Sequence, residues 1–139
     1  PLDWQEWNNE AEAPFIPECP LPARLAKADD ATEIPIDIAD DLLSASQDGL
    51  LDEVILRVMI YNLTALDTLE FSLNGTVLDA ASARKRLLYN ECWIDFNVAS
   101  LLRKGWNHLG VKVKGRNPHL DAPLRVESVE VIVRYKPVV

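Results

Sequence analysis

The chain has 139 residues, of which 48% are apolar, and its formal net charge is -8. A chain of this length suits one domain and can fold on its own core without disulfides or a metal. No apolar run approaches the roughly 20 residues of a membrane-spanning helix, and the dispersed basic residues form no nucleic-acid-binding motif. We therefore expect neither a membrane nor a nucleic-acid partner.

The charge is divided unevenly along the chain. Residues 1–53 hold 14 acidic and two basic side chains, whereas residues 54–139 hold eight acidic and 12 basic ones. An acidic N-terminal part therefore precedes a mildly basic body. The acidic part is expected to contact either that body or a neighbouring domain.

Residues 1–31 are predicted to form an extended, proline-rich arm or interdomain linker, followed by a β-sandwich domain over residues 32–139. Proline lacks the backbone N–H that a regular ladder needs. Trp4 and Trp7 indicate that the arm packs on something, because each indole brings a large apolar area. Because the sequence begins at Pro1 rather than Met, we expect a fragment or a processed form of a longer protein. Five prolines fall in the arm: Pro1, Pro14, Pro17, Pro20 and Pro22.

The first predicted strands follow the arm. Isoleucines at every second position of 34–38 share one face, and Pro35 limits that strand to a sheet edge or to a position where its missing N–H donor is not needed. Residues 40–52 are predicted to be a polar connection. The nearly continuous apolar run over 54–63 predicts a central strand, covered on much of both faces.

A hairpin is predicted next. Residues 68–74 alternate between apolar and polar, and Asn74-Gly75 favours a type I′ turn, because both central residues of that turn need positive φ. Residues 76–78 would return as a short strand. Residues 80–88 favour a helix or an irregular loop.

Three strands are predicted in the C-terminal part. Residues 91–98 alternate, with their even-numbered apolar residues on the core face. Residues 100–104 are predicted to form one helical turn, which Gly105 would close in a left-handed conformation. Residues 106–114 and 124–135 read as further strands, and a change of parity in the last predicts a β-bulge near Ser128.

About seven short strands without β-α-β alternation predict an all-β fold, an antiparallel β-sandwich or jelly roll. The succession LNG, WIDFNV, LLRKGWNHLGVKV and VESVEVIVRY resembles the galactose-binding-like jelly roll, over about residues 32–136. Gly105-Trp106-Asn107 matches the Gly-x-Asn corner of that family, which leads into a valine-rich strand. The resemblance is to C-terminal accessory domains of glycoside hydrolase-type multidomain proteins. It therefore implies a neighbouring catalytic domain in the same chain.

No catalytic set is apparent. His108 and His119 are the two histidines, and neither has a metal-ligand spacing to a second histidine or a cysteine. Nucleophile-elbow, P-loop and dinucleotide-binding motifs are missing. We expect no catalytic residue, no enzyme activity of this chain itself and no cofactor. A structural Ca²⁺ bound by adjacent acidic residues is the alternative, and an active site would require Asp95 to converge with the two histidines.

Aromatic residues are better candidates for a binding site. By parity, Trp93 and Trp106 leave the core face, and sugar rings stack on such flat aromatic surfaces while polar groups bind their hydroxyls. The alternative is that the N-terminal arm or a neighbouring domain covers both indoles. The predicted carbohydrate-binding residues are Trp93 with Asp95 and Asn97, Trp106 with His108, and the loop residues Arg116, Asn117 and His119.

The sequence therefore predicts a non-catalytic β-sandwich accessory module of a larger, carbohydrate-active protein, with carbohydrate as its ligand. The alternative is a purely structural domain, for interdomain packing or oligomerisation, that binds no ligand. The sugar, the oligomeric state and the redox state of Cys19 and Cys92 stay open. The compartment stays open as well, with an extracellular or periplasmic location favoured.

Overall fold

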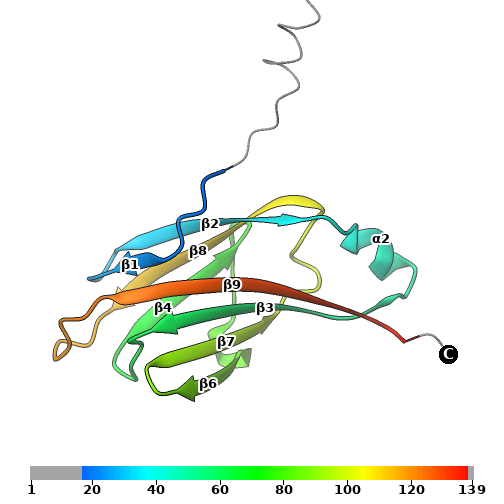
Figure 1. The fold of residues 1–139 in the computed structure, drawn as a ribbon. Coiled ribbons are helices and arrows are strands. Elements are labelled where there is room, and N and C mark those ends of the chain that lie inside the picture. The colour runs from blue at the N-terminus through cyan, green and yellow to red at the C-terminus, as the bar shows by residue number, and fades with distance from the viewer. Residues whose placement is uncertain (1–16, 138–139) are drawn as a thin grey trace, which may run out of the picture.

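Two antiparallel β-sheets pack face to face in this protein (Figure 1). The structure is a computed structural model that describes residues 17–137. The expected packing of Trp4 and Trp7 lies outside the described residues. None of the helices in the described part is long and apolar enough to cross a membrane.

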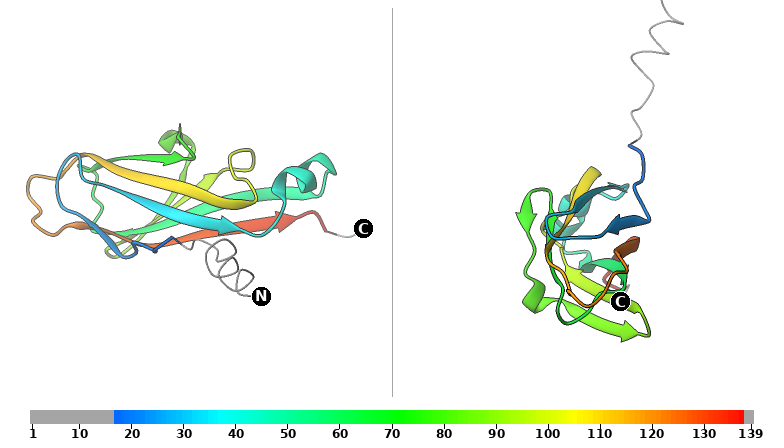
Figure 2. Two further views of the ribbon diagram at one scale, coloured as in Figure 1. Left: turned by 90° about the horizontal axis from the view of Figure 1, so that it is seen from above. Right: turned by 90° about the vertical axis from the view of Figure 1, so that its left-hand side faces the viewer.

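The strands are divided between a five-stranded and a four-stranded sheet. Each neighbouring pair is antiparallel, and Figure 2 shows the two layers from above and from one end. In spatial order, the five-stranded sheet contains β1 (Ala23–Leu25), β9 (Leu124–Tyr135), β3 (Leu51–Tyr61), β7 (Glu91–Asn97) and β6 (Arg84–Leu88). The four-stranded sheet contains β2 (Ala31–Ile38), β8 (Gly105–Gly115), β4 (Thr68–Leu73) and β5 (Thr76–Val77). These two packed sheets confirm the predicted all-β sandwich.

The core fills the space between the sheets with alternate side chains of each strand. On β3, every second side chain from Val54 to Ile60 is fully buried, and Leu109, Val111 and Val113 of β8 face it from the other layer. Phe71 and Phe96 join the layers, with ring centroids 5.0 Å apart. Each such side chain contributes about 1.5–3 kcal/mol through its burial. The period of two in the sequence therefore fixes which residues face the core.

Several predictions about individual elements are confirmed. β3 lies between β9 and β7, and Pro35 lies on β2, at the edge of its sheet. Asn74 and Gly75 have φ values of 50° and 85°, as the predicted hairpin turn requires. The bulge in β9 is present, because Met59 pairs with Ser128 but Ile60 with Val126.

The prediction for residues 80–88 is wrong. Only Ala80–Ser82 forms a short 3-10 helix, and Arg84–Leu88 forms β6, which pairs with β7 at the edge of the sheet. All five residues of β6 are exposed. An edge strand without buried residues lacks the apolar alternation that identifies a strand, so its pairing with β7 is not visible in the sequence.

Three connecting segments also differ from expectation. The polar connection over 40–52 contains the helix α2 (Leu42–Gln47), which Asp41 caps by accepting a hydrogen bond from the Ser44 amide at 3.1 Å. Residues 100–104 form turns rather than a helical turn, although Gly105 does have a positive φ of 90°. Within the described part of the arm, 17–31, the short strand β1 pairs with β9.

Candidate functional site

The predicted binding residues lie in three separate places. Trp93, Asp95 and Asn97 project from β7 on the outer face of the five-stranded sheet, because Cys92, Ile94 and Phe96 point into the core. Trp106 and His108 project from β8 on the outer face of the four-stranded sheet. The two sheets turn their inner faces toward each other, so the two indoles point in opposite directions. They do not form one platform.

Trp93 is half-buried between the neighbouring strands. It pairs across the sheet with Met59 of β3 and Arg86 of β6. Its indole N–H donates a hydrogen bond to a carboxylate oxygen of Glu91 at 3.1 Å. The guanidinium carbon of Arg86 lies 5.8 Å from the ring centroid, within the range of a cation–π contact. The indole is therefore held in a fixed orientation while part of it stays accessible.

Asp95 is held by a two-pronged ion pair on the same face. Nε and Nη2 of Arg57 donate to its two carboxylate oxygens at 2.9 and 3.0 Å. These hydrogen bonds lower the pKa of Asp95 and raise that of Arg57, so both groups stay charged near neutral pH. A carboxylate offers about four acceptor positions, and Arg57 occupies two of them. Asp95 can therefore accept further hydrogen bonds from a ligand.

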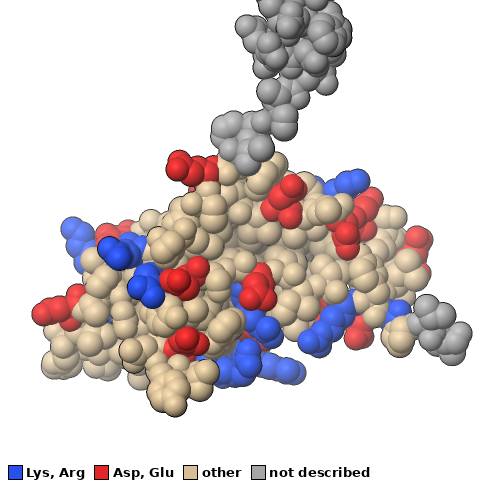
Figure 3. Space-filling view, viewed as in Figure 1, with Lys and Arg blue, Asp and Glu red and all other residues tan. Residues whose placement is uncertain are grey.

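A polar groove of about 230 Å³ lies beside this ion pair, and Asp95 and Asn97 both line it. Glu53 and Arg84 add a second carboxylate and a guanidinium to its walls. Figure 3 looks toward the five-stranded sheet and shows acidic and basic side chains interspersed over this side of the molecule. The groove thus combines hydrogen-bond donors and acceptors, although Trp93 itself does not line it.

The Trp106 face is arranged differently. Trp106 pairs across the sheet with Asp37, and Nδ1 of His108 lies 3.1 Å from a carboxylate oxygen of Glu33 on β2. A shallow hollow of about 360 Å³ lies on this face around Gly110, but neither Trp106 nor His108 lines it.

Arg116 and Asn117 fasten loops together instead of bordering an open cleft. Nη1 of Arg116 donates to the fully buried carboxylate of Asp67 at 2.6 Å, and the backbone N–H of Asn117 donates to the same oxygen at 2.7 Å. Arg116 also donates to the carbonyl oxygens of Ala26 and Ala122. Its guanidinium thereby ties the segments around Ala26 and Asp67 to the β8–β9 loop and also braces that loop at Ala122.

Asp67 accepts two more hydrogen bonds, from the backbone N–H and the hydroxyl of Thr64 at 2.8 and 2.9 Å. Burial acts to raise the pKa of Asp67, but the hydrogen bonds from Asn117, Thr64 and Arg116 outweigh it and hold that pKa below its ordinary value. Sequence reasoning missed this residue. Its one local signal is the Thr-x-x-Asp spacing, which is typical of a side-chain-stabilised turn.

Asn107 is a buried polar residue near the start of β8, next to the turn between β4 and β5. It is fully buried, and its side-chain oxygen accepts hydrogen bonds from Asn74 at 2.8 Å and from the Arg103 amide at 3.0 Å. Its side-chain nitrogen donates to the carbonyl oxygens of Arg103 and Gly105 at 2.8 and 3.0 Å. All its hydrogen-bonding positions are used within the protein, so Asn107 shapes the turn before β8.

Asp95, His108 and His119 do not converge. Asp95 belongs to the other sheet from His108, and His119 is an exposed residue of the β8–β9 loop. At about 3.3 Å per residue, that loop begins about 26 Å along β8 from His108. Within residues 17–137, no group of three or more histidine, cysteine or acidic side chains is placed to hold a metal ion.

No protein-family model matches the chain. No curated protein matches it either.

Proposed function

We propose that this chain is a non-catalytic β-sandwich accessory module of a larger, carbohydrate-active protein, and that its outer face around Trp93 binds a glycan. One observation carries the proposal: Trp93 shares the outer face of β7 with the ordered carboxylate of Asp95, and Asp95 lines a polar groove. The Gly105-Trp106-Asn107 corner, with its buried amide network, supports a relation to galactose-binding-like jelly rolls.

The chemistry of this face suits a sugar. The apolar C–H face of a pyranose packs on an indole, while fixed polar groups bind its hydroxyls. Arg57 orients the carboxylate of Asp95 and the turn after β7 orients Asn97, whose side-chain oxygen accepts a hydrogen bond from the Ala99 amide. A preorganised site loses less entropy when the ligand binds.

A glycan array followed by calorimetric titration of the best hit tests the proposal. Trp93→Ala is expected to abolish binding, because it removes the stacking surface. Trp106→Ala is the matched control, since it removes the same side chain from the opposite face, and it should leave the affinity unchanged. An array without any hit, or a Trp93→Ala variant that binds like the wild type, would overturn the proposal.

A purely structural role is the second candidate, and the tip of the β6–β7 hairpin favours it. Leu87, Leu88 and Tyr89 are 74%, 56% and 97% exposed. Contiguous apolar residues of this kind are typical of a protein–protein contact. Light scattering tests self-association: a dimer that Leu88→Ser converts to a monomer supports the structural role, and a monomeric wild type counts against oligomerisation.

A further inference from the structure

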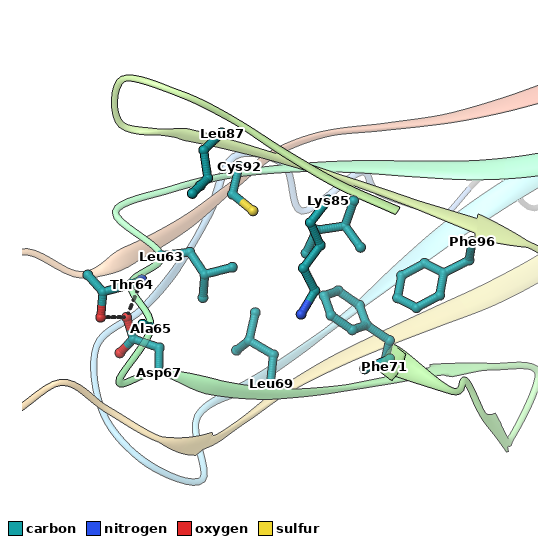
Figure 4. Close-up of a pocket in the computed structure, with 12 residues that line it drawn as sticks. Leu63, Thr64, Ala65, Asp67, Leu69, Phe71, Lys85, Leu87, Cys92 and Phe96 are labelled. Atoms are coloured by element: carbon teal, nitrogen blue, oxygen red, sulfur yellow. Dashed lines mark hydrogen bonds between the residues drawn. The ribbon is translucent and has the colours of Figure 1, made fainter. Parts of the chain in front are cut away.

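A cavity of about 310 Å³ opens between the two sheets, beneath β6 and β7 (Figure 4). It exists because the sheets end unevenly at this side. β5 has two residues and pairs with β4 only at Ser72 and Leu73, so the inner faces of β6 and β7 extend past it. Leu69, Phe71, Ile94 and Phe96 therefore line a space that β5 does not cover.

The walls of this cavity are mainly apolar. Protein interiors are packed closely and leave few voids larger than a water molecule. An engineered apolar cavity of about 150 Å³ is large enough for benzene. At about twice that volume, this cavity can hold an apolar body of about eight carbons or two rings.

Among residues 17–137, three ionisable side chains border the cavity, and one of them, Lys85, is a charged group that forms no salt bridge there. The Asp67 carboxylate is bound by Arg116, Thr64 and Asn117, and burial raises the pKa of the Cys92 thiol, which keeps it neutral. Lys85 is directed inward, because its cross-strand neighbour on β7 is the buried Ile94. Its side chain extends from β6 into the cavity (Figure 4).

Within residues 17–137, no carboxylate lies within 4.0 Å of the Lys85 ammonium, whereas Lys114 on β8 does have a partner in Glu70. A cation beside an apolar cavity complements an anion attached to an apolar body. Such a ligand would bury its apolar part against Phe71 and Ile94 and leave its charged group at Lys85.

We propose that this cavity is a second binding site, separate from the Trp93 face, for a small amphiphile with an apolar body and one carboxylate. The two sites lie on opposite sides of β7: Trp93 projects outward, whereas Ile94 projects into the cavity. This proposal does not depend on glycan binding.

Calorimetric titration of the whole chain with octanoate and with octan-1-ol tests the proposal. Both probes share the apolar chain, but only octanoate carries a charge. We expect saturable binding of one octanoate per chain, about five- to tenfold tighter than that of octan-1-ol. Lys85→Met should reduce the octanoate affinity to that of the alcohol. Lys104→Met, which removes an exposed lysine outside the cavity, should leave the preference for octanoate unchanged.

Variants that fill the cavity provide a second test of the proposal. Ala65→Trp places an indole at the exposed rim of the cavity, and Leu69→Trp places one inside it. Each variant is expected to abolish binding of both octanoate and octan-1-ol. Circular dichroism verifies that each variant is folded. If wild type binds neither probe saturably, the cavity is a packing void only and the proposal is overturned. Equal affinity for both probes, or unchanged octanoate binding by Lys85→Met, would overturn the role of the carboxylate.

Discussion

The side-chain nitrogen of Asn74, in the turn between β4 and β5, donates a hydrogen bond of 2.8 Å to the side-chain oxygen of Asn107, at the start of β8. Asn74 also accepts one from the His108 amide at 2.9 Å and donates one to the Leu101 carbonyl at 3.0 Å. The hairpin turn and the Gly-x-Asn corner are therefore one hydrogen-bonded unit, although 33 residues separate the two asparagines. This unit closes one end of the four-stranded sheet.

Asn107→Ala is expected to lower the free energy of unfolding by about 3 kcal/mol, because it removes a fully buried amide and the hydrogen bonds that it makes with Asn74 and the backbone of Arg103 and Gly105. Urea denaturation monitored by tryptophan fluorescence measures the change. Asn97→Ala is the control, since Asn97 is an exposed asparagine in the sheet, and it should change stability by less than about 0.5 kcal/mol. Equal stabilities of the two variants would contradict the role of the corner.

The buried Asp67–Arg116 pair predicts a pH dependence of stability. Because the folded-state pKa of Asp67 lies below the unfolded value of about 3.9, the ionised carboxylate stabilises the fold above that pH. The contribution is lost as the pH falls through the folded-state pKa. Asp67→Asn should therefore lower the free energy of unfolding by about 3 kcal/mol at pH 7.

The same comparison at pH 3 and below separates this linkage from a simple packing defect. The difference between wild type and Asp67→Asn should shrink there, because the wild-type carboxyl becomes protonated as well. Asp121→Asn, an exposed aspartate of the β8–β9 loop, serves as control and should match wild type at both pH values. A difference that is the same at pH 7 and pH 3 would contradict the argument.

Tyr89 is a strained residue at the tip of the β6–β7 hairpin. Its φ is 56°, a left-handed value that is uncommon for an aromatic residue, and its side chain is 97% exposed. Tyr89→Gly is therefore expected to raise the free energy of unfolding by about 0.5–1 kcal/mol. Tyr89→Ala removes the ring but keeps the Cβ, so it should give no such gain in a thermal or urea unfolding experiment.

The two cysteines should differ in reactivity. Cys92 is buried, and burial raises the pKa of its thiol, whereas Cys19 is exposed. The thiolate is the reactive form. An Ellman titration at pH 8 should release one equivalent promptly and the second only after denaturant is added. Prompt reaction of both thiols in the folded protein would contradict the burial of Cys92.

Sequence patterns correctly predicted the strands in which at least one face is buried. The apolar run of β3 reflects a strand that is covered on both faces. The Asn74-Gly75 pair reflects a turn that needs positive φ. β6 carries no such signal, because its five residues are exposed and its pairing depends on β7. The short strand β1 was not predicted, because prolines surround it in the sequence. It is a strand because it pairs with β9.

The candidate site was predictable only in part. Alternation correctly placed Trp93 and Trp106 on outward faces, but periodicity within a strand does not tell which sheet that strand joins. Only the topology places the two indoles on opposite sides. Arg116 was predicted to border a cleft, because its partner Asp67 is 49 residues away in sequence. A buried ion pair between two loops produces no periodic pattern in the sequence.

The sheet order has a practical consequence for handling this protein. β1 and β6 occupy opposite edges of the five-stranded sheet, about 19 Å apart at about 4.8 Å per strand spacing. The described chain enters at the β1 edge (Figure 1). The groove and the cavity both border β6. Tethering the molecule to a biosensor surface through its N-terminal side should therefore leave both proposed ligand sites facing the flowing analyte.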